Sequence, residues 1–220
     1  MVEGGCKKVS GFANSIYRGS DMIMKLAYLN LLWIGFSLLG GIILGVFPAT
    51  VALFTVIRKW IMGNKDISIF QTFWQCYKRD FVGINVIGLV LGIIGFVLAV
   101  DIYYFSSINS LLSKSILIIF GILSLFYLIT ILYLIPTYVH FELKGFQYVK
   151  YALILGITNI GGTIVIILGC VAVTFVYMKL PATLLFFSMS VIGVIVMWPA
   201  YRGFLKINNQ GQMDLVKANK

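Results

Sequence analysis

Carboxylates, thiols and imidazoles are scarce in this sequence. Its 220 residues include seven acidic side chains, one histidine and three cysteines, which are Cys6, Cys76 and Cys170. No two of these cysteines form a C-x-x-C pair and no histidine cluster lies near them. The sequence therefore predicts neither a metal site nor a disulfide framework, and we expect no cofactor.

Charge of either sign is also sparse. Charged residues make up 11% of the chain, whereas soluble domains carry about 25%. Because 60% of the residues are hydrophobic, the chain cannot cover itself with a polar surface, and lipid must be its solvent. The apolar runs are continuous, which excludes the alternating pattern of a transmembrane barrel. We predict an all-α, polytopic helical membrane protein with a single membrane domain over residues 1–220.

Four uncharged stretches are each long enough to cross a hydrocarbon core about 30 Å thick. They occupy residues 81–100, 115–139, 151–178 and 180–201, so that 81–201 is expected to hold four full spans. The third is longer than a span requires, and we expect it to tilt or to extend past the bilayer.

A longer apolar run begins at Leu26 and contains no charge before Arg58. One helix over these residues (26–57, or 32 residues) would be about 48 Å long, well beyond the bilayer core. Pro48 lies two thirds of the way along the run. It either kinks one long helix or opens a second helix that turns back.

The positions of lysine and arginine distinguish these two topologies. A returning hairpin puts 15 of the 17 basic residues on one side of the membrane and leaves only Lys114 and Lys179 on the other. A single kinked helix would leave six on the opposite side, including Lys7, Lys8 and Arg18. The positive-inside rule favours the hairpin.

The hairpin topology places both termini in the cytoplasm and the chain in the plasma membrane. Residues 1–25 then form a cytoplasmic N-terminal segment and residues 206–220 a cytoplasmic tail. The net charge of +10 flanks the apolar runs, so its expected partner is the anionic headgroups of the cytoplasmic leaflet rather than nucleic acid.

Local chemistry also favours a hairpin over residues 26–62. Gly40, Gly41 and Gly45 weaken a continuous helix. Proline suits the first turn of a helix, where its missing N–H costs nothing. We predict two short antiparallel helices, 26–39 and 48–62, with Pro48 opening the second. This hairpin either crosses a thinned bilayer or re-enters it.

An amphipathic stretch separates the hairpin from the first long span. Its apolar residues share one helical face, namely Ile67, Phe70, Trp74, Tyr77 and Phe81. Asp66 is a suitable N-cap. An aromatic-rich amphipathic helix with terminal cations is typical of a membrane interface, so we predict an interfacial helix over 66–80.

Polar residues near membrane depth are few. Asp101 falls at one interface and His140 and Glu142 at the other, so we expect no catalytic dyad and no enzyme. Three asparagines within or beside the apolar runs are expected to form interhelical hydrogen bonds: Asn30, Asn85 and Asn159.

Short motifs in the first hundred residues carry a resemblance to a known family. They are the run NLLW at 30–33, the run PAT at 48–50 and the aromatic residues between 70 and 77. This pattern resembles the YesL family of bacterial integral membrane proteins, a domain family of unknown function. The residues that match it are Asn30, Leu31, Leu32, Trp33, Pro48, Ala49, Thr50, Phe70, Phe73, Trp74 and Tyr77. Phe47 departs from the pattern, because a glycine often precedes the proline.

Members of that family tend to be encoded beside systems for carbohydrate uptake and polysaccharide degradation. The resemblance implies a non-catalytic accessory protein that assists a sugar importer, with the importer's membrane subunits as its partners. An alternative stays open. The chain could itself be a small-solute permease that works through the Pro48 hairpin, since free N–H groups at a helix start can hold an anion.

Overall fold

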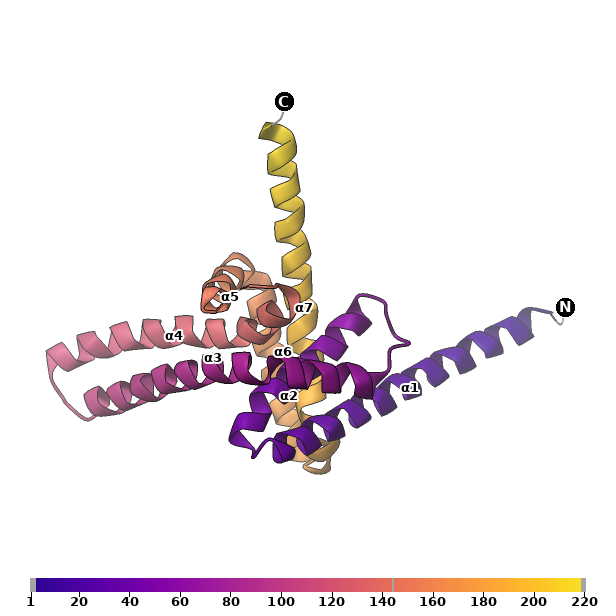
Figure 1. The fold of residues 1–220 in the computed structure, drawn as a ribbon, viewed down its shortest axis with the longest axis horizontal. Coiled ribbons are helices and arrows are strands. Elements are labelled where there is room, and N and C mark those ends of the chain that lie inside the picture. The colour runs from indigo at the N-terminus through magenta and orange to yellow at the C-terminus, as the bar shows by residue number, and fades with distance from the viewer. Residues whose placement is uncertain (1–2, 144, 219–220) are drawn as a thin grey trace.

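The computed structural model describes the backbone of residues 3–143 and 145–218, and the side chains of residues 17, 19–143 and 145–206. Lys7, Lys8 and Arg18 lie outside the described side chains. The described part of the chain holds seven helices and no strand (Figure 1). They are α1 (Glu3–Leu39), α2 (Ile43–Ile61), α3 (Ile69–Ser106), α4 (Leu111–His140), α5 (Gln147–Thr158), α6 (Ile160–Lys179) and α7 (Ala182–Ala218).

Six helical segments within the described residues are long and apolar enough to cross a membrane. They are α2, α3, α4 and α6 together with Gly19–Leu39 of α1 and Ala182–Lys206 of α7. The chain is therefore a polytopic helical membrane protein, as its composition predicts.

The predicted N-terminal hairpin is present, and glycines make its turn. Gly41 has a φ of 73° and Ile42 a φ of 61°, so the chain reverses through two left-handed residues. A Cβ on Gly40 would collide with the backbone of Gly45, in the first turn of the returning helix. The close approach of the two helices thus depends on Gly40 and Gly45.

Pro48 does not open the second helix, and that part of the prediction is wrong. Helix α2 begins at Ile43, so Pro48 is its sixth residue and the missing N–H leaves the Leu44 carbonyl without its usual i+4 donor. The Asn85 side chain of α3 supplies a replacement, since its Nδ2 donates to Leu44 O at 2.9 Å. A neighbouring helix therefore compensates for the proline, which explains why it is tolerated there.

The predicted helix over 66–80 is not a separate element. It continues without a break into the first long span, so that α3 is 38 residues long. The helix begins at Ile69 with Ser68 at the cap position, rather than at Asp66. Lys78, Arg79 and Asp80, which resemble a boundary in the sequence, stay inside the helix.

The predicted span over 151–178 is in fact two helices. The chain breaks between α5 and α6 at Asn159, whose φ and ψ are −112° and 52°. Asn159 Nδ2 donates to Pro199 O of α7 at 3.3 Å, and a Cβ on Gly203 would lie 2.7 Å from the same nitrogen. The break is thus fixed by docking against α7, which hydropathy does not reveal.

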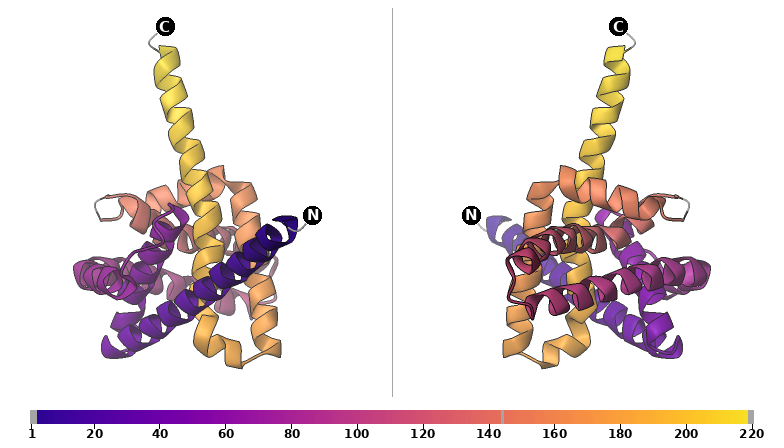
Figure 2. Two further views of the ribbon diagram at one scale, coloured as in Figure 1. Left: turned by 90° about the vertical axis from the view of Figure 1, so that its right-hand side faces the viewer. Right: turned by 90° about the vertical axis from the view of Figure 1, so that its left-hand side faces the viewer.

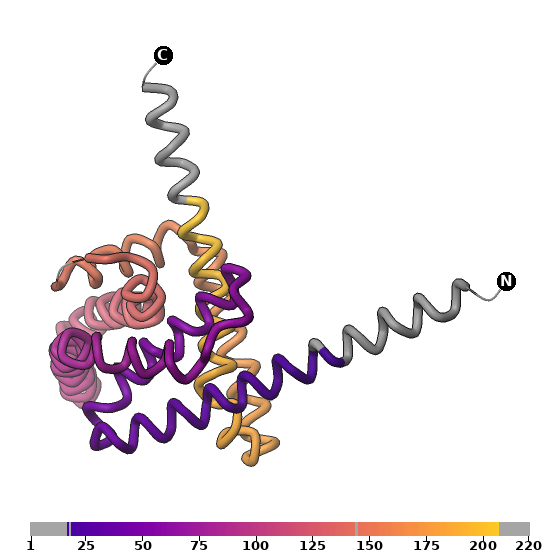
Figure 3. The backbone as a smooth tube through the Cα atoms, turned by 45° about the vertical axis from the view of Figure 1, so that its right-hand side comes forward, coloured from indigo at the N-terminus to yellow at the C-terminus, as the bar shows by residue number. Residues whose placement is uncertain are grey.

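Helix α2 forms the centre of the molecule. Eleven of its 19 residues are buried, and its side chains pack between α1, α3 and α7. A Cβ on Gly193 of α7 would lie 2.6 Å from Ile57 and 2.8 Å from Leu53, so α7 approaches α2 closely through this glycine. Helix α1 also packs against α7, and Figure 3 shows it crossing the α6–α7 hairpin.

Two long hairpins diverge from this centre. The α3–α4 hairpin runs across the direction of the α6–α7 hairpin (Figures 1 and 2). The buried residues of α3 end at Leu91 and those of α4 resume at Thr130, with Ser113 the one buried residue between them. The outer half of the α3–α4 hairpin therefore projects from the core and packs on itself, as in the stacking of Phe105 on Phe120 at 5.8 Å.

We expect single cysteines to confirm the order of crossings. In a variant whose native cysteines are replaced, Lys65→Cys precedes α3, Asn109→Cys follows it, and Lys179→Cys ends α6. One span separates positions 65 and 109, whereas α4 and α6 separate 109 and 179. A membrane-impermeant maleimide should label 109 and 179 from one side and 65 from the other. Labelling of 109 and 179 from opposite sides would contradict six crossings.

The Asn85 contact predicts a measurable coupling with Pro48. Asn85→Leu removes the donor to the Leu44 carbonyl and should lower the free energy of unfolding by about 1–3 kcal/mol. Pro48→Ala restores a backbone N–H for that carbonyl, so Asn85→Leu should cost at least about 1 kcal/mol less in its presence. A double-mutant cycle of reversible unfolding in mixed micelles measures the difference. The same cost in both backgrounds would refute the compensation.

Candidate functional site

The family-motif residues join α1 to its neighbours. Trp33 Nε1 donates to Thr50 Oγ1 at 3.0 Å, and the Thr50 hydroxyl in turn donates to Val46 O at 2.7 Å. Ala49 is fully buried beside them, where a larger side chain would separate the two helices. The NLLW and PAT runs therefore form one structural unit that holds the α1–α2 hairpin closed.

Asn30 binds α7 through both ends of its amide. Its Nδ2 donates to Leu185 O at 2.8 Å, and its Oδ1 accepts from the backbone N–H of Met189 at 2.9 Å. Leu185 O and Met189 N are the acceptor and donor of one i to i−4 pair, so the amide bridges a rung of the α7 ladder. The side chain is completely buried, and this contact fixes α1 against the start of α7.

The aromatic motif of α3 surrounds Phe36 of α1. The rings of Phe70, Trp74 and Tyr77 lie 6.3, 5.3 and 5.1 Å from the Phe36 ring, and the Tyr77 hydroxyl donates to Phe36 O at 3.1 Å. Phe70 and Trp74 remain 48% and 37% exposed, however, while Phe73 is fully buried.

The buried stripe of this part of α3 is therefore rotated from the predicted face. Its members are Thr72, Phe73, Cys76, Tyr77 and Asp80. The stripe packs on α1 and α2. The spacing of apolar residues within α3 could not predict it, because that spacing does not show where α1 and α2 lie. Phe47, the departure from the family pattern, also has a structural partner, because its ring fills the space beside Gly88, where a Cβ would lie 2.8 Å away.

The motif residues thus make contacts that shape the fold, and the polar chemistry lies elsewhere. A cavity of about 850 Å³ opens where α2 ends, near the beginning of α3 and the end of α4. We call this side of the molecule the basic end, because Arg58, Lys59, Lys65, Lys78 and Arg79 lie there. The lining combines both signs of charge with hydroxyl, phenol and amide groups: Thr55, Arg58, Lys59, Thr72, Gln75, Arg79, Asp80, Tyr138, His140, Glu142 and Tyr148.

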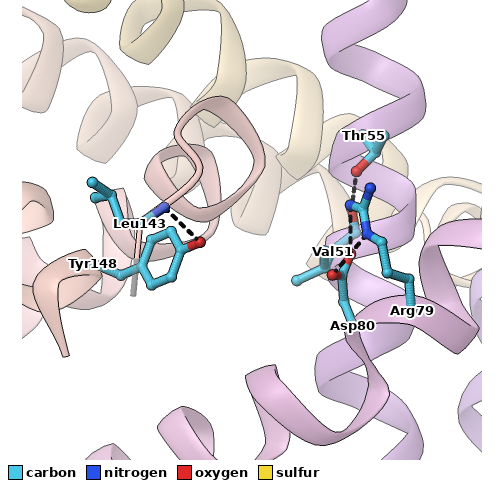
Figure 4. A network of polar contacts seen from close by, with 6 residues as sticks. All are labelled: Val51, Thr55, Arg79, Asp80, Leu143 and Tyr148. Atoms are coloured by element: carbon cyan, nitrogen blue, oxygen red, sulfur yellow. Dashed lines mark hydrogen bonds and ion pairs between the residues drawn. The ribbon is translucent and has the colours of Figure 1, made fainter. Parts of the chain in front are cut away.

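One wall of the cavity carries an internal ion pair (Figure 4). Arg79 donates to both carboxylate oxygens of Asp80, at 3.0 Å from Nε and 2.9 Å from Nη2. Asp80 is only 8% exposed, and such a bidentate pair compensates for burying its charge. The Thr55 hydroxyl beside them donates to Val51 O at 2.8 Å.

The facing wall carries a phenol with a free proton. Tyr148 O accepts the Leu143 backbone N–H at 3.0 Å, which leaves its own O–H proton available to a further acceptor (Figure 4). The Tyr148 ring packs on Tyr138 at 4.5 Å, and this contact fixes its position at the start of α5.

Arg58 and His140 connect the cavity to α7. Arg58 Nε donates to His140 Nδ1 at 3.3 Å, and the imidazole stacks on Phe204 at 4.2 Å with an interplanar angle of 11°. The hydrogen bond requires an imidazole whose Nδ1 carries no proton. His140 is therefore a neutral acceptor that positions the Arg58 guanidinium.

Sequence reasoning missed this cavity. It treated His140 and Glu142 as separate interface residues and overlooked Asp80, because the adjacent Lys78 and Arg79 resembled the polar end of an interfacial helix. The available signal was the spacing of Thr72, Cys76 and Asp80 along one helical face. As predicted, Asp101 is remote from His140, since it lies near the opposite end of the α3–α4 hairpin. The described residues include no group of three His, Cys, Asp or Glu side chains that could hold a metal ion.

Asn30 allows a sharp test of its bridging role. In Asn30→Leu the Leu185 carbonyl and the Met189 N–H still have each other as i to i−4 partners, so the loss of stability should be about 1–2 kcal/mol. Asn30→Asp keeps the shape but places a buried carboxylate against the Leu185 carbonyl, and should cost about 3 kcal/mol or more. Thermal stability in detergent, with Asn109→Asp in the exposed loop as the control, ranks the variants. An Asn30→Asp protein as stable as Asn30→Leu would show that the amide does not donate to α7.

The comparisons with known proteins give a consistent result. The family model described as "Protein of unknown function, DUF624" matches residues 26–102. Uncharacterized protein YesV of Bacillus subtilis (strain 168) is 36% identical over 197 residues, which cover 90% of this chain and 95% of that protein.

Two further proteins of the same organism also match along most of the chain. Uncharacterized protein YteU is 36% identical over 91% of this chain and 90% of its own length, and uncharacterized protein YesL is 28% identical over 94% and 97%. No solved structure matches. The chain therefore belongs to the YesL-like family of membrane proteins of unknown function.

Proposed function

We propose that this chain is a non-catalytic accessory protein that associates, within the plasma membrane, with the membrane subunits of a carbohydrate importer. The carbohydrate assignment rests on the family resemblance. The association rests on one structural feature, the outer half of the α3–α4 hairpin, which extends from the core and offers apolar helix faces to a neighbour.

The length of this projection supports the proposal. Helix α2 pairs with α3 as far as Asn85 and Gly88, through Leu44 and Phe47. From Gly88 to the end of α3 at Ser106 a further 18 residues extend the helix by about 27 Å, and α4 accompanies it to the tip of the hairpin. A pair of helices isolated in this way can pack against the helices of a second membrane protein without rearranging its own core.

We further propose that the basic end faces the cytoplasm, and with it both termini. The connection from α2 to α3 carries Lys65 and the adjoining helix ends carry Arg58, Lys59, Lys78 and Arg79, whereas the α3–α4 and α6–α7 connections each adjoin a single cation, Lys114 and Lys179. The positive-inside rule assigns the richer side to the cytoplasm. An importer's cytoplasmic components would then meet the same side of the molecule as the polar cavity.

The alternative, a permease that works through the Pro48 hairpin, loses its original motivation. The N–H groups proposed to hold an anion belonged to a helix starting at Pro48, but that residue lies inside α2 and the freed carbonyl is occupied by Asn85. Transport by the chain alone remains the outcome that separates the two proposals.

Photo-crosslinking from the hairpin tests the association. A benzophenone amino acid at Ile122 of α4, which is 52% exposed, should crosslink in native membranes to a protein identified by mass spectrometry as a membrane subunit of a carbohydrate importer. The matched control is Leu168 of α6, 63% exposed and equally apolar, which should not give that product. The purified chain should not take up labelled oligosaccharide in proteoliposomes.

Three results would overturn the proposal. One is an absence of importer products from Ile122, and another is equal yields from Ile122 and Leu168, which would mean contact by chance. The third is oligosaccharide uptake into proteoliposomes that hold only this chain, which would make it a permease.

A further inference from the structure

We propose that the cavity at the basic end binds a phosphate ester, held by Arg58, Lys59 and Tyr148. The volume of about 850 Å³ lies within the usual range for small-molecule sites. The ligand class follows from which charged and polar side chains of the lining have a partner within the protein and which do not.

The anionic groups of the lining do not neutralise Arg58 or Lys59. Asp80 is occupied by Arg79 in a bidentate pair, and Glu142 is exposed and pairs with no cation among the described residues. No carboxylate of the described residues lies within ion-pair distance of Arg58 or Lys59. Two consecutive cations therefore border a polar cavity without a counter-charge.

The position of Arg58 is set by the fold. Its Nε is engaged by His140, which stacks on Phe204, so the guanidinium is fixed, while its terminal nitrogens donate to no side chain or carbonyl in the described part of the chain. Neither Arg58 nor Lys59 donates to a carbonyl at the end of α2 among the described hydrogen bonds. Ordering a guanidinium before the ligand arrives lowers the entropic cost of binding.

A third donor, Tyr148, lines the same cavity. The buried Tyr148 phenol accepts a hydrogen bond from Leu143, and no acceptor among the described residues takes its own proton. A guanidinium, an ammonium and a phenol O–H supply donors of the kind that phosphate oxygens accept. Gln75 and Thr72 add polar groups that suit a hydroxylated substituent on the phosphate.

The location permits two sources for such a ligand. The cavity lies where the α2 and α4 spans end, at Ile61 and His140, which is the level of lipid headgroups. A phosphatidylglycerol headgroup, a phosphodiester, and soluble glycerol 3-phosphate, a monoester, both present an anionic phosphate ester and a glycerol diol. The chemistry is shared, and the experiment distinguishes the sources.

Binding to the purified, delipidated chain tests the proposal with four probes: dioleoylphosphatidylglycerol, dioleoylphosphatidylcholine, glycerol 3-phosphate and inorganic phosphate. Native mass spectrometry measures lipid binding and thermal shift measures the soluble probes. We expect phosphatidylglycerol to bind at least tenfold more tightly than phosphatidylcholine if the source is lipid. We expect a saturable thermal shift with glycerol 3-phosphate if the source is soluble.

Matched variants locate the site. R58Q/K59Q should weaken binding of the active probe at least tenfold, whereas K114Q/K179Q, which removes two positive charges that do not line the cavity, should change that binding less than twofold. Tyr148→Phe removes one neutral donor and should weaken binding about fivefold. This milder variant decides the question if R58Q/K59Q does not fold.

Several outcomes would overturn the assignment. The wild-type chain could bind the two lipids equally and ignore both soluble phosphates, which would mean that no phosphate site exists. R58Q/K59Q, or Tyr148→Phe if the double variant does not fold, could keep the wild-type affinity for the active probe. Equal losses in R58Q/K59Q and K114Q/K179Q would indicate general charge attraction.

Discussion

The arrangement of the helices depends on one constraint: backbone polar groups in lipid need hydrogen-bond partners within the protein, because no water is there to supply them. Three asparagine side chains supply such partners across helix contacts. Asn85 donates to the carbonyl that Pro48 leaves free, Asn30 bridges a rung of α7, and Asn159 donates to Pro199 O where α5 and α6 separate. Each contact is an amide bound to a backbone group of a distant segment, so each specifies one position of one helix against another. Apolar packing alone would specify these helix positions less well, because lipid tails can make the same apolar contacts.

The sequence predicted the features that a lipid environment requires of any membrane protein, namely long apolar helices and an uneven distribution of cations between the two sides. Hydropathy located the spans, and the positions of lysine and arginine identified the hairpin around Gly40. The sequence also predicted that the three asparagines would form interhelical hydrogen bonds, which the structure confirms. The local boundaries could not be predicted, because tertiary contacts determine them. Asn159 breaks an unbroken apolar run by docking on α7, and Pro48 is tolerated inside α2 because Asn85 lies beside it.

The candidate site was harder to foresee than the fold. Its residues come from α2, α3, α4 and α5, and none of the four segments contains a recognisable chemical motif. Arg79 and Asp80 are neighbours in sequence, but the sequence does not show that Asp80 is buried. The ion pair matters because it compensates for burying the Asp80 carboxylate beside α2. The family motifs hold α1, α2 and α3 in position but supply none of the residues that line the cavity, so their role in the site is indirect.

The central position of α2 has a consequence for the order in which the protein is made. This helix has the lowest mean hydropathy of the six candidate spans, 1.4, and the largest buried share, 61%. Its carbonyl at Leu44 finds the Asn85 donor only when α3 has been synthesised, and Leu53 and Ile57 pack beside Gly193 of α7, which lies far downstream of α2 in the sequence. Until then the nascent chain exposes its least hydrophobic helix to lipid. The first hairpin therefore reaches its final packing only after both α3 and α7 have been synthesised.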